Sequence, residues 1–308
     1  MTILLNNNGH DNETWRKEFV KQLPAFNVRL LSEIDAPDNV TYAMVWNHPK
    51  GDLLRYPNLK AIFSLGAGAE NFIGDDALPD VPIVLLADPN VARDMAAHAL
   101  YWVMDCHRRY PLYREQQASG IWLRASITAT PDFSVGVLGL GRIGTEVAYQ
   151  IARFGYKVSG WDLFEKSLDG ISTVSGMASL NDFLSGNDVV INCLPLTPST
   201  RHSLGDAEFG AMREGTYFIN ISRGAVVQDE ALIRALNSGH LAGAALDAFA
   251  TEPLPADSPY WTHPRVNITP HMSGATFASN AVKVIVENVK RVECGESPFP
   301  ILDRARGY

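Results

Sequence analysis

Three residues that could act together on a carbonyl group each follow a short apolar stretch: Arg223, Glu252 and His271. The guanidinium of Arg223 has a permanent charge and a fork of N–H donors, so it could bind a carboxylate and polarise an adjacent ketone. His271 could donate a proton to the ketone oxygen during reduction. Glu252 could accept a hydrogen bond from the other imidazole nitrogen, which would orient the ring and raise its pKa.

Each of these residues also has a simpler explanation when it is taken alone. A single histidine among eight is more often structural than catalytic, and Arg223 before Gly224 could be an ordinary turn residue. Glu252, before a proline, could be part of an exposed extended segment. Their order and spacing after a dinucleotide motif favour a catalytic set.

The dinucleotide motif is the G-x-G-x-x-G pattern between residues 139 and 144, which follows an apolar stretch and precedes a helical one. Gly139 permits a tight turn, Gly141 lets the backbone approach a pyrophosphate, and Gly144 lets the helix pack closely on the strand. A glycine-rich turn without a ligand is the alternative. The predicted cofactor contacts in this loop are Gly139, Gly141, Arg142, Ile143 and Gly144.

Asp162 ends the next predicted strand, at roughly the 20-residue spacing expected for an acid that accepts from the ribose hydroxyls. A carboxylate there would repel a 2′-phosphate, so we predict NAD as the cofactor, with NADP as the alternative. Lys166 could neutralise a phosphate, and Asp162 could simply cap the following turn.

The 308 residues are about twice a usual domain length, so two domains are expected. Short apolar runs alternate with amphipathic stretches, which is typical of parallel sheets with crossover helices. A helix is predicted over Asp11–Gln22. The first strands are predicted at Thr2–Leu5, Asn27–Leu31, Tyr42–Trp46, Lys60–Leu65 and Ile83–Leu85.

A long helix is predicted over Arg93–Arg109, with Pro111 ending it. A second strand series then begins, and the final helix, about Ala275–Glu293, is expected to return to the first domain. These later strands are predicted at Ser134–Leu138, Lys157–Trp161, Asp188–Asn192, Thr216–Asn220, Gly243–Leu246 and Val266–Ile268.

The predicted fold class is therefore α/β, with two Rossmann-like, doubly wound parallel-sheet domains and an active site in the interdomain cleft. A discontinuous substrate-binding (catalytic) domain would comprise residues 1–97 and 276–308, and a dinucleotide-binding domain residues 98–275.

The composition argues against several classes of partner. A formal net charge of −8 disfavours nucleic acids and anionic membranes. The three cysteines lie far apart without CxxC spacing, which suits a reducing compartment. No apolar run approaches the roughly 18 residues of a membrane span, the amino terminus lacks signal-peptide features, and the histidines form no metal-ligand cluster. We expect a cytoplasmic protein with no metal, nucleic-acid or membrane partner.

The stretch from about Leu65 to Gly274 resembles the D-isomer-specific 2-hydroxyacid dehydrogenase family. The resemblance implies a nicotinamide-dependent oxidoreductase for a small 2-oxo or D-2-hydroxy acid. It implies that Arg223 binds and polarises the 2-oxo acid and that Glu252 and His271 form the acid–base pair. The matching segments are Val137–Gly144, Cys193–Pro198, Asn220–Gly224, Leu246–Pro255 and Thr269–His271.

The same resemblance implies further contacts. Asp247 would lie near the nicotinamide carboxamide, and Leu194, Pro195 and Thr197 would line the adenine and ribose side. Backbone N–H groups of the loop over residues 65–69 would hold the substrate carboxylate, a role that suits glycine; an ordinary turn is the alternative. The implied substrate-binding residues are Trp46, Leu65, Gly66, Ala67, Gly68, Arg223 and His271.

Within the family the chain looks most like the glyoxylate/hydroxypyruvate reductases, because of Trp46–Pro49 and the segment Gln116–Trp122. The region Leu112–Arg124 could be a surface loop or an arm that packs on a second subunit of a homodimer, where Trp122 or Arg124 could reach the partner's pocket. Many members of this group carry a Ser-Arg pair and prefer NADP, and Asp162-Leu163 does not match that pair.

Two other functions stay open at this point. The chain could be another D-2-hydroxyacid dehydrogenase, for lactate, phosphoglycerate or a bulkier acid, or a non-catalytic dinucleotide-sensing protein. Intact Arg223, Glu252 and His271 argue against the sensor, because a sensor does not need a protonated histidine beside the nicotinamide.

Overall fold

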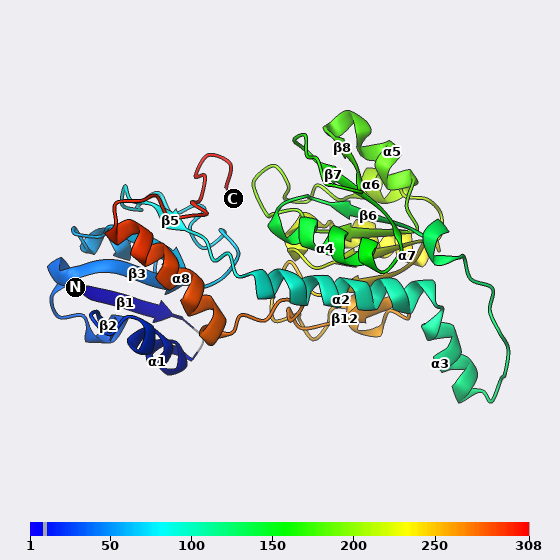
Figure 1. Ribbon diagram of the computed structural model, residues 1–308. Coiled ribbons are helices and arrows are strands. Elements are labelled where there is room, and N and C mark those ends of the chain that lie inside the picture. Colours follow the sequence, from blue (N-terminus) through cyan, green and yellow to red (C-terminus); the bar gives the residue numbers. More distant parts are fainter. Residues whose placement is uncertain (9–10, 308) are drawn as a thin grey trace. The chain divides into compact units, whose positions relative to one another are not determined.

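Two separate parallel sheets organise the chain, and the computed structural model describes residues 1–8 and 11–307 (Figure 1). One unit contains residues 1–90 and 276–308, and the other contains residues 91–275. The predicted α/β class, with two Rossmann-like domains, is confirmed. The predicted boundary at residue 97 falls inside helix α2 (Pro89–His107), and the structure assigns Val91 onward to the second unit, because the buried face of this helix packs on the second sheet.

The second unit has a seven-stranded sheet in the order β12-β11-β10-β9-β6-β7-β8, with every pair parallel. The strand order reverses between β6 and β9, which is the place where doubly wound sheets bind their ligands. Its strands are β6 (Ser134–Leu138), β7 (Lys157–Asp162), β8 (Ser172–Ser175), β9 (Val189–Asn192), β10 (Thr216–Asn220), β11 (Leu241–Leu246) and β12 (Val266–Ile268).

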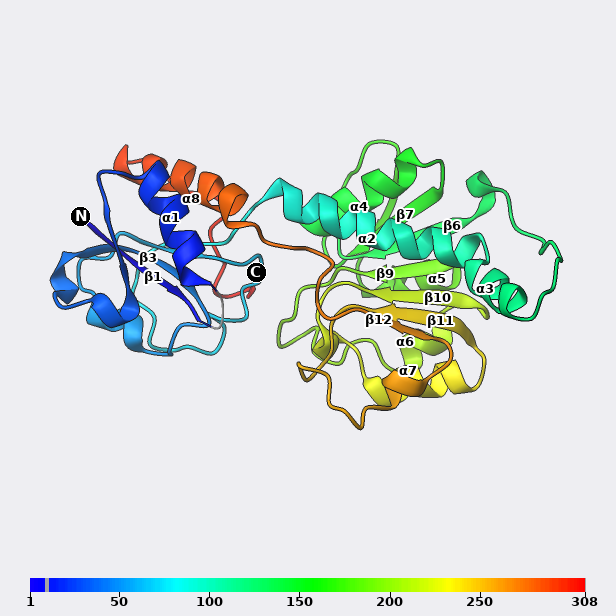
Figure 2. The ribbon, with the colours of Figure 1, turned by 90° about the horizontal axis from the view of Figure 1, so that it is seen from below.

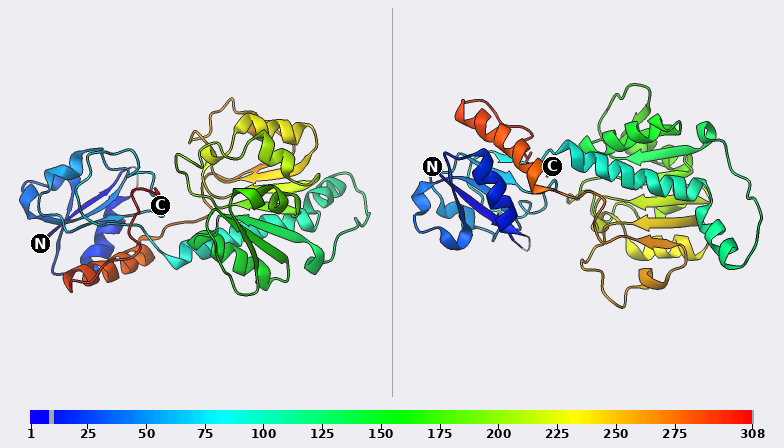
Figure 3. Two further views of the ribbon diagram at one scale, coloured as in Figure 1. Left: turned by 90° about the horizontal axis from the view of Figure 1, so that it is seen from above. Right: turned by 60° about the horizontal axis from the view of Figure 1, so that its bottom comes forward.

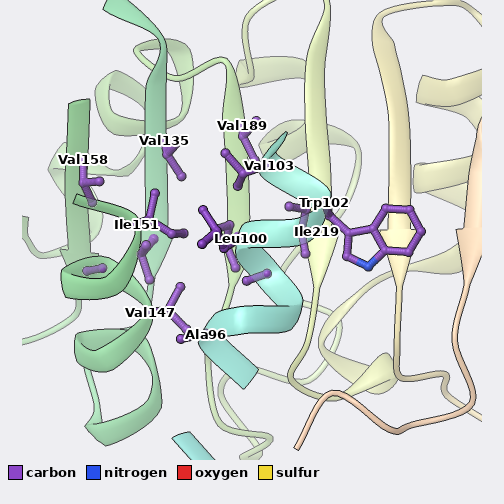
Figure 4. Close-up of a cluster of buried hydrophobic side chains, with 14 of the residues drawn as sticks. Ala96, Leu100, Trp102, Val103, Val135, Val147, Ile151, Val158, Val189 and Ile219 are labelled. Carbon is purple, nitrogen blue, oxygen red and sulfur yellow. The ribbon is translucent and has the colours of Figure 1, made fainter. Parts of the chain in front are cut away.

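Helices cover both faces of this sheet (Figure 2). On one face, α2 and α4 (Arg142–Arg153) pack against β6, β9 and β10 through buried aliphatic side chains such as Leu100, Val147 and Ile219 (Figure 4). On the other face lie α5 (Leu180–Ser185), α6 (Asp206–Ala211) and α7 (Asp229–Asn237). Burial on both faces explains why these strands appear in the sequence as continuous apolar runs.

The first unit has a five-stranded parallel sheet in the order β2-β1-β3-β4-β5. One face is covered by α1 (Asn12–Gln22) and α8 (Ala278–Glu293), which also contact each other. Three-residue and four-residue 3₁₀ turns and the carboxyl-terminal segment cover the other face. The strands are β1 (Thr2–Asn7), β2 (Asn27–Leu30), β3 (Val40–Trp46), β4 (Ala61–Ser64) and β5 (Ile83–Val84).

The segment after α2 differs from the prediction. Helix α2 ends at His107, and Pro111 lies in the first turn of a further helix, α3 (Tyr110–Ala118), where the missing N–H of proline costs nothing. Arg114 anchors α3 to α2 through an ion pair with buried Asp105 at 2.9 Å. After a turn at Ser119 and Gly120, an extended segment over residues 121–129 follows (Figure 3), and in it the indole of Trp122 is fully exposed.

The sequence did not predict β8, because its four residues, S-T-V-S, are mostly exposed and pair only with β7 at the sheet edge. Among the described residues, no helix is both long and apolar enough to span a bilayer.

Helix α8 supplies much of the core of the first unit, and this leads to a stability prediction. Ile285 is 2% exposed and packs in the cluster with Phe19 and Tyr42. We expect Ile285→Ala to lower the free energy of unfolding of the first unit by about 2–5 kcal/mol, through lost burial and a cavity. Urea-dependent hydrogen exchange on first-unit peptides would measure it. Val20→Ala on α1, where Val20 is 49% exposed, is the control and should cost about 0.5 kcal/mol or less. Equal losses in the two variants would contradict the assignment.

Candidate active site

His271 and Glu252 form a hydrogen-bonded pair at the carboxyl-terminal edge of the second sheet. The Nδ1 atom of His271 lies 2.7 Å from Oε2 of Glu252, and the side chains are 44% and 35% exposed. This hydrogen bond is the main cause that raises the pKa of His271, although burial opposes it. Burial would raise the pKa of Glu252, but the hydrogen bonds from His271 and from the backbone N–H of Phe249 lower it. The pair therefore favours a charged imidazole whose Nε2 can donate a proton.

The backbone at His271 has φ 50°, a left-handed conformation that is uncommon for residues other than glycine. Asp247 holds this turn. Its carbonyl accepts from the His271 N–H at 2.8 Å, and its carboxylate accepts from the Thr269 hydroxyl at 2.6 Å and from the N–H groups of Met272 and Ser273, each at 2.9 Å. Burial raises the pKa of Asp247, but these hydrogen bonds outweigh it and lower the pKa.

Asp247, which the sequence predicts as a cofactor contact, has a structural role in the turn. The residue is 1% exposed, and both carboxylate oxygens already accept hydrogen bonds from the turn. The structure places Asp247 beneath the segment that carries His271, where it fixes the position of the imidazole.

Arg223 follows β10 at the same edge of the sheet. The register places Leu138, Asn192, Asn220, Leu246 and Ile268 side by side at the ends of five neighbouring strands. The loop over residues 220–224 is held by Asn220, whose Oδ1 accepts from Asn192 Nδ2 at 3.0 Å and from the Ser222 N–H at 3.1 Å.

Gly224 brings the arginine loop against the segment that leads to Glu252. A Cβ at Gly224 would lie 1.9 Å from the carbonyl carbon of Phe249, so no other residue fits there. The positive charge of Arg223 is close enough to influence the pKa values of both Glu252 and His271. The three residues predicted as a catalytic set are thus brought together in one unit.

The glycine loop between β6 and α4 is shaped to approach a phosphate group. Gly139 has φ 88°, and a Cβ at Gly144 would lie 1.8 Å from the carbonyl oxygen of Gly139. A Cβ at Gly141 would meet nothing within 4 Å, so the surface above this residue is open. Gly141 is also the N-cap of α4. The first N–H groups of that helix, from Arg142 and Ile143 onward, lie at its N-terminal end, which stabilises a bound anion. These features fit a dinucleotide pyrophosphate.

Asp162 ties the glycine loop to the end of β7. Its Oδ2 accepts from the Leu140 N–H at 2.8 Å, and its Oδ1 accepts from the Phe164 N–H at 3.1 Å. Each carboxylate oxygen keeps a second lone pair, so the group can still accept from a ribose hydroxyl.

The segment after β9 is a compact turn beside the glycine loop. A Cβ at Gly139 would meet the backbone of Cys193 and Leu194 at 3.0 Å, so this segment lies directly against that loop. The Thr197 hydroxyl is bonded inside the turn, to Ser199 and Thr200, and Thr197 is 6% exposed. The hydroxyl of Thr200 also donates to the carbonyl of Pro195. Thr197 is therefore placed to shape the turn.

The other predicted substrate residues lie in the first unit: Trp46 ends β3, and the loop over residues 65–68 follows β4. The Leu65 N–H donates to the Val45 carbonyl at 3.0 Å, and the Gly66 N–H donates to the buried Ser64 hydroxyl at 3.3 Å. In the described part of the chain, the N–H groups of Ala67 and Gly68 have no protein acceptor. These two are the donors that the loop can offer to a carboxylate.

Sequence reasoning missed the residues that support the site. Asn192 and Asn220 are fully buried and bond to each other, and Thr269 bonds to Asp247. A signal was present, because two neighbouring apolar strands, V-V-I-N and T-Y-F-I-N, each end in asparagine.

Comparison with known proteins agrees with this geometry. Residues 100–273 match the family model described as D-isomer specific 2-hydroxyacid dehydrogenase, NAD binding domain. The chain is 34% identical to glyoxylate/hydroxypyruvate reductase A of Yersinia enterocolitica and 36% identical to that of Klebsiella pneumoniae, and each alignment covers 100% of both chains.

Solved structures agree as well. A D-isomer specific 2-hydroxyacid dehydrogenase from Xanthobacter autotrophicus, in complex with NADPH and MES, superposes with a TM-score of 0.95 at 38% identity over 99% of both chains. An NADPH-dependent glyoxylate/hydroxypyruvate reductase from Sinorhizobium meliloti, in complex with NADP and sulfate, gives a TM-score of 0.92 at 29% identity over 100% of both chains. The predicted resemblance is confirmed, and the chain belongs to the D-isomer-specific 2-hydroxyacid dehydrogenase family.

Proposed function

We propose that the protein reduces glyoxylate or hydroxypyruvate, small 2-oxo acids, to the corresponding D-2-hydroxy acid. The observation that carries the proposal is the His271–Glu252 pair, held at 2.7 Å at the same sheet edge as Arg223 and the glycine loop. The choice of substrate rests on the full-length similarity to proteins named glyoxylate/hydroxypyruvate reductase.

The roles of the residues follow from their chemistry. Arg223 would bind the carboxylate and polarise the ketone, and Nε2 of His271 would donate the proton that the reduced oxygen requires. Glu252 would orient the imidazole and stabilise its charged form, while Asp247 would hold the turn in place. When bound, a reduced nicotinamide supplies the hydride.

The N–H groups of Ala67 and Gly68 are our candidates for a second contact with the substrate carboxylate, next to Trp46. Residues 1–90 and 276–308 would form the substrate-binding domain, and residues 91–275 would form the dinucleotide-binding domain.

For the cofactor, we propose a preference for NAD over NADP. The carboxylate of Asp162 lies at the end of β7, and Leu163, Phe164 and Glu165 follow it, so the next three side chains bring no cation to a 2′-phosphate. The solved relatives named above bind NADPH or NADP, and the acid at this position is our reason for expecting a different choice in this protein.

We also propose a cytoplasmic homodimer. The described cysteines are all unpaired, as expected in a reducing compartment. The segment after α3 exposes Ile121, Trp122 and Leu123, by 53%, 103% and 65% respectively. It directly follows α3, which the Arg114–Asp105 ion pair anchors. Contiguous apolar exposure of this kind supports burial against a second copy of the chain.

The main test is oxidation of NADH or NADPH in the presence of glyoxylate, hydroxypyruvate and bulkier 2-oxo acids. We expect turnover with the small acids, and we expect Arg223→Ala and His271→Ala each to lower kcat/KM by at least ~100-fold, through loss of the charge clamp or the proton donor. His263→Ala, at a half-buried histidine outside the site, is the matched control. Absence of turnover with every acid and both cofactors would instead favour a dinucleotide-sensing protein.

The pH dependence follows from the direction of the pKa shift of His271. Reduction requires the protonated imidazole, so kcat/KM should fall as the pH rises through the raised pKa of His271. Glu252→Gln removes the main cause of that shift, so the basic limb of the profile should move to lower pH. Steady-state rates measured across pH would show this, with exposed Glu230→Gln as the control. An unmoved limb in Glu252→Gln would refute the role of the pair.

The cofactor proposal predicts a higher kcat/KM for NADH than for NADPH. Asp162→Asn removes the charge and keeps an acceptor for the Leu140 N–H, so the NADH/NADPH ratio should fall by about 10-fold as the repulsion of the 2′-phosphate is lost. Asp169→Asn, at an exposed acid further along the chain, should leave the ratio unchanged. A wild-type preference for NADPH would overturn the assignment.

A further inference from the structure

Trp46 packs directly on the loop that we propose for the substrate carboxylate. A Cβ at Gly66 would lie 2.3 Å from Cζ3 and 2.6 Å from Cη2 of the indole. The ring therefore occupies the space that a side chain at Gly66 would need. The position of the indole and the position of the loop depend on each other.

Trp46 is the last residue of β3 and pairs with Asn7 in β1, and the backbone turns sharply after it. Asn47 has φ 49°, in the left-handed region, and the chain leaves the sheet at this point. Asn8 bonds to both residues of the bend, with its N–H on the Trp46 carbonyl at 3.1 Å and its Nδ2 on the Asn47 carbonyl at 3.1 Å.

The next residue, His48, is a buried histidine that the proposed reaction does not use. Its side chain is 4% exposed. Nδ1 lies 2.8 Å from Nδ2 of Asn6, at the end of β1, and Nε2 lies 2.9 Å from Oδ2 of Asp52, in the 3₁₀ turn Asp52–Arg55. An amide nitrogen only donates, so Nδ1 is the acceptor and Nε2–H donates to Asp52.

The charged and polar groups around His48 fix this arrangement. Asp52 is itself held by Arg55 at 2.7 Å and by the hydroxyl of buried Tyr56 at 3.3 Å. Burial is the largest influence on the pKa of His48 and lowers it, while Asp52 and Asp75 oppose the shift and Arg55 adds to it. The imidazole therefore stays neutral, with both ring nitrogens bonded, and its orientation is determined.

A small cavity lies beside Trp46 and His48. Trp46, His48, Asn71 and Asp75 line it, and the space open to the centre of a water molecule is about 10 Å³. Nδ2 of Asn71 is buried and has no partner in the part of the chain that the structure describes. A single water molecule there would satisfy this donor.

We propose that His48 is a positioning residue for substrate binding: it fixes the Trp46 turn between Asn6 and Asp52, and through Trp46 it fixes the loop that presents the Ala67 and Gly68 N–H groups to a 2-oxo acid carboxylate. This inference rests on the proposed function for the identity of the ligand. The positional link between His48 and the loop stands on the geometry alone.

The test compares His48→Leu, which removes both hydrogen bonds, with His48→Gln, which can still donate to Asp52. We expect His48→Leu to raise the KM for glyoxylate by roughly 5–10-fold with kcat and the KM for NADH within about 2-fold, because a carboxylate contact is shared by the ground state and the transition state. Amide exchange in peptides over residues 61–72 should be about 10-fold faster. His48→Gln should recover part of both effects.

His263→Gln is the matched control, because His263 is also bonded to a side chain, Asn237, and lies in the other unit. If His48→Leu does not fold, Asn6→Ala removes the donor to Nδ1 and should move KM and exchange in the same direction. Unchanged exchange and KM in a folded variant would overturn the proposal, as would a loss confined to kcat. Failure of the proposed function would instead appear as absence of turnover in the wild-type protein, while the exchange measurement would still test the link.

Discussion

A buried carboxylate, Asp247, holds the turn that carries His271, and the geometry of the site depends on it. The turn needs a left-handed residue at His271, which is unfavourable for a side chain with a Cβ. Four hydrogen bonds to one residue, three of them to its carboxylate, offset that cost. The imidazole is thereby placed where Nδ1 meets Glu252, and Nε2 is the atom that we propose as the proton donor to the substrate.

The parallel sheet explains why residues far apart in sequence meet at this place. Five strands end side by side, so the segments after β6, β9, β10, β11 and β12 emerge along one edge. Along that edge lie, in order, the glycine loop, the Asn192–Asn220 pair, the arginine loop, Asp247 and the turn at His271. The absence of a side chain at Gly139 and at Gly224 allows neighbouring loops to approach one another closely.

The sequence predicted most strands of both sheets to within one or two residues, because strands buried on both faces are short apolar runs bounded by polar residues. The prediction failed for elements that lack a run of buried apolar residues. The edge strand β8 is polar and was missed, and Pro111 lies in the first turn of α3 although it was expected to end the preceding helix. The proposed catalytic residues could be named from the sequence because Arg, Glu and His follow apolar strands in a fixed order after the glycine motif. Asn192, Asn220 and Thr269 could not, since their functions lie in hydrogen bonds to other parts of the chain.

The sequence alone was enough to identify the α/β class, the glycine loop with Asp162, and the set Arg223, Glu252 and His271, because apolar periodicity and residue type are local properties. Only the tertiary structure decided that the Asp247 carboxylate bonds to the histidine turn, that two N–H groups of the 65–68 loop already have protein acceptors, and that Trp46 packs on Gly66 beside a neutral, buried His48. These facts depend on register, on backbone dihedral angles and on which donor meets which acceptor across distant segments. The sequence shows which residues could make such contacts, but it does not show how far apart they lie in the folded chain.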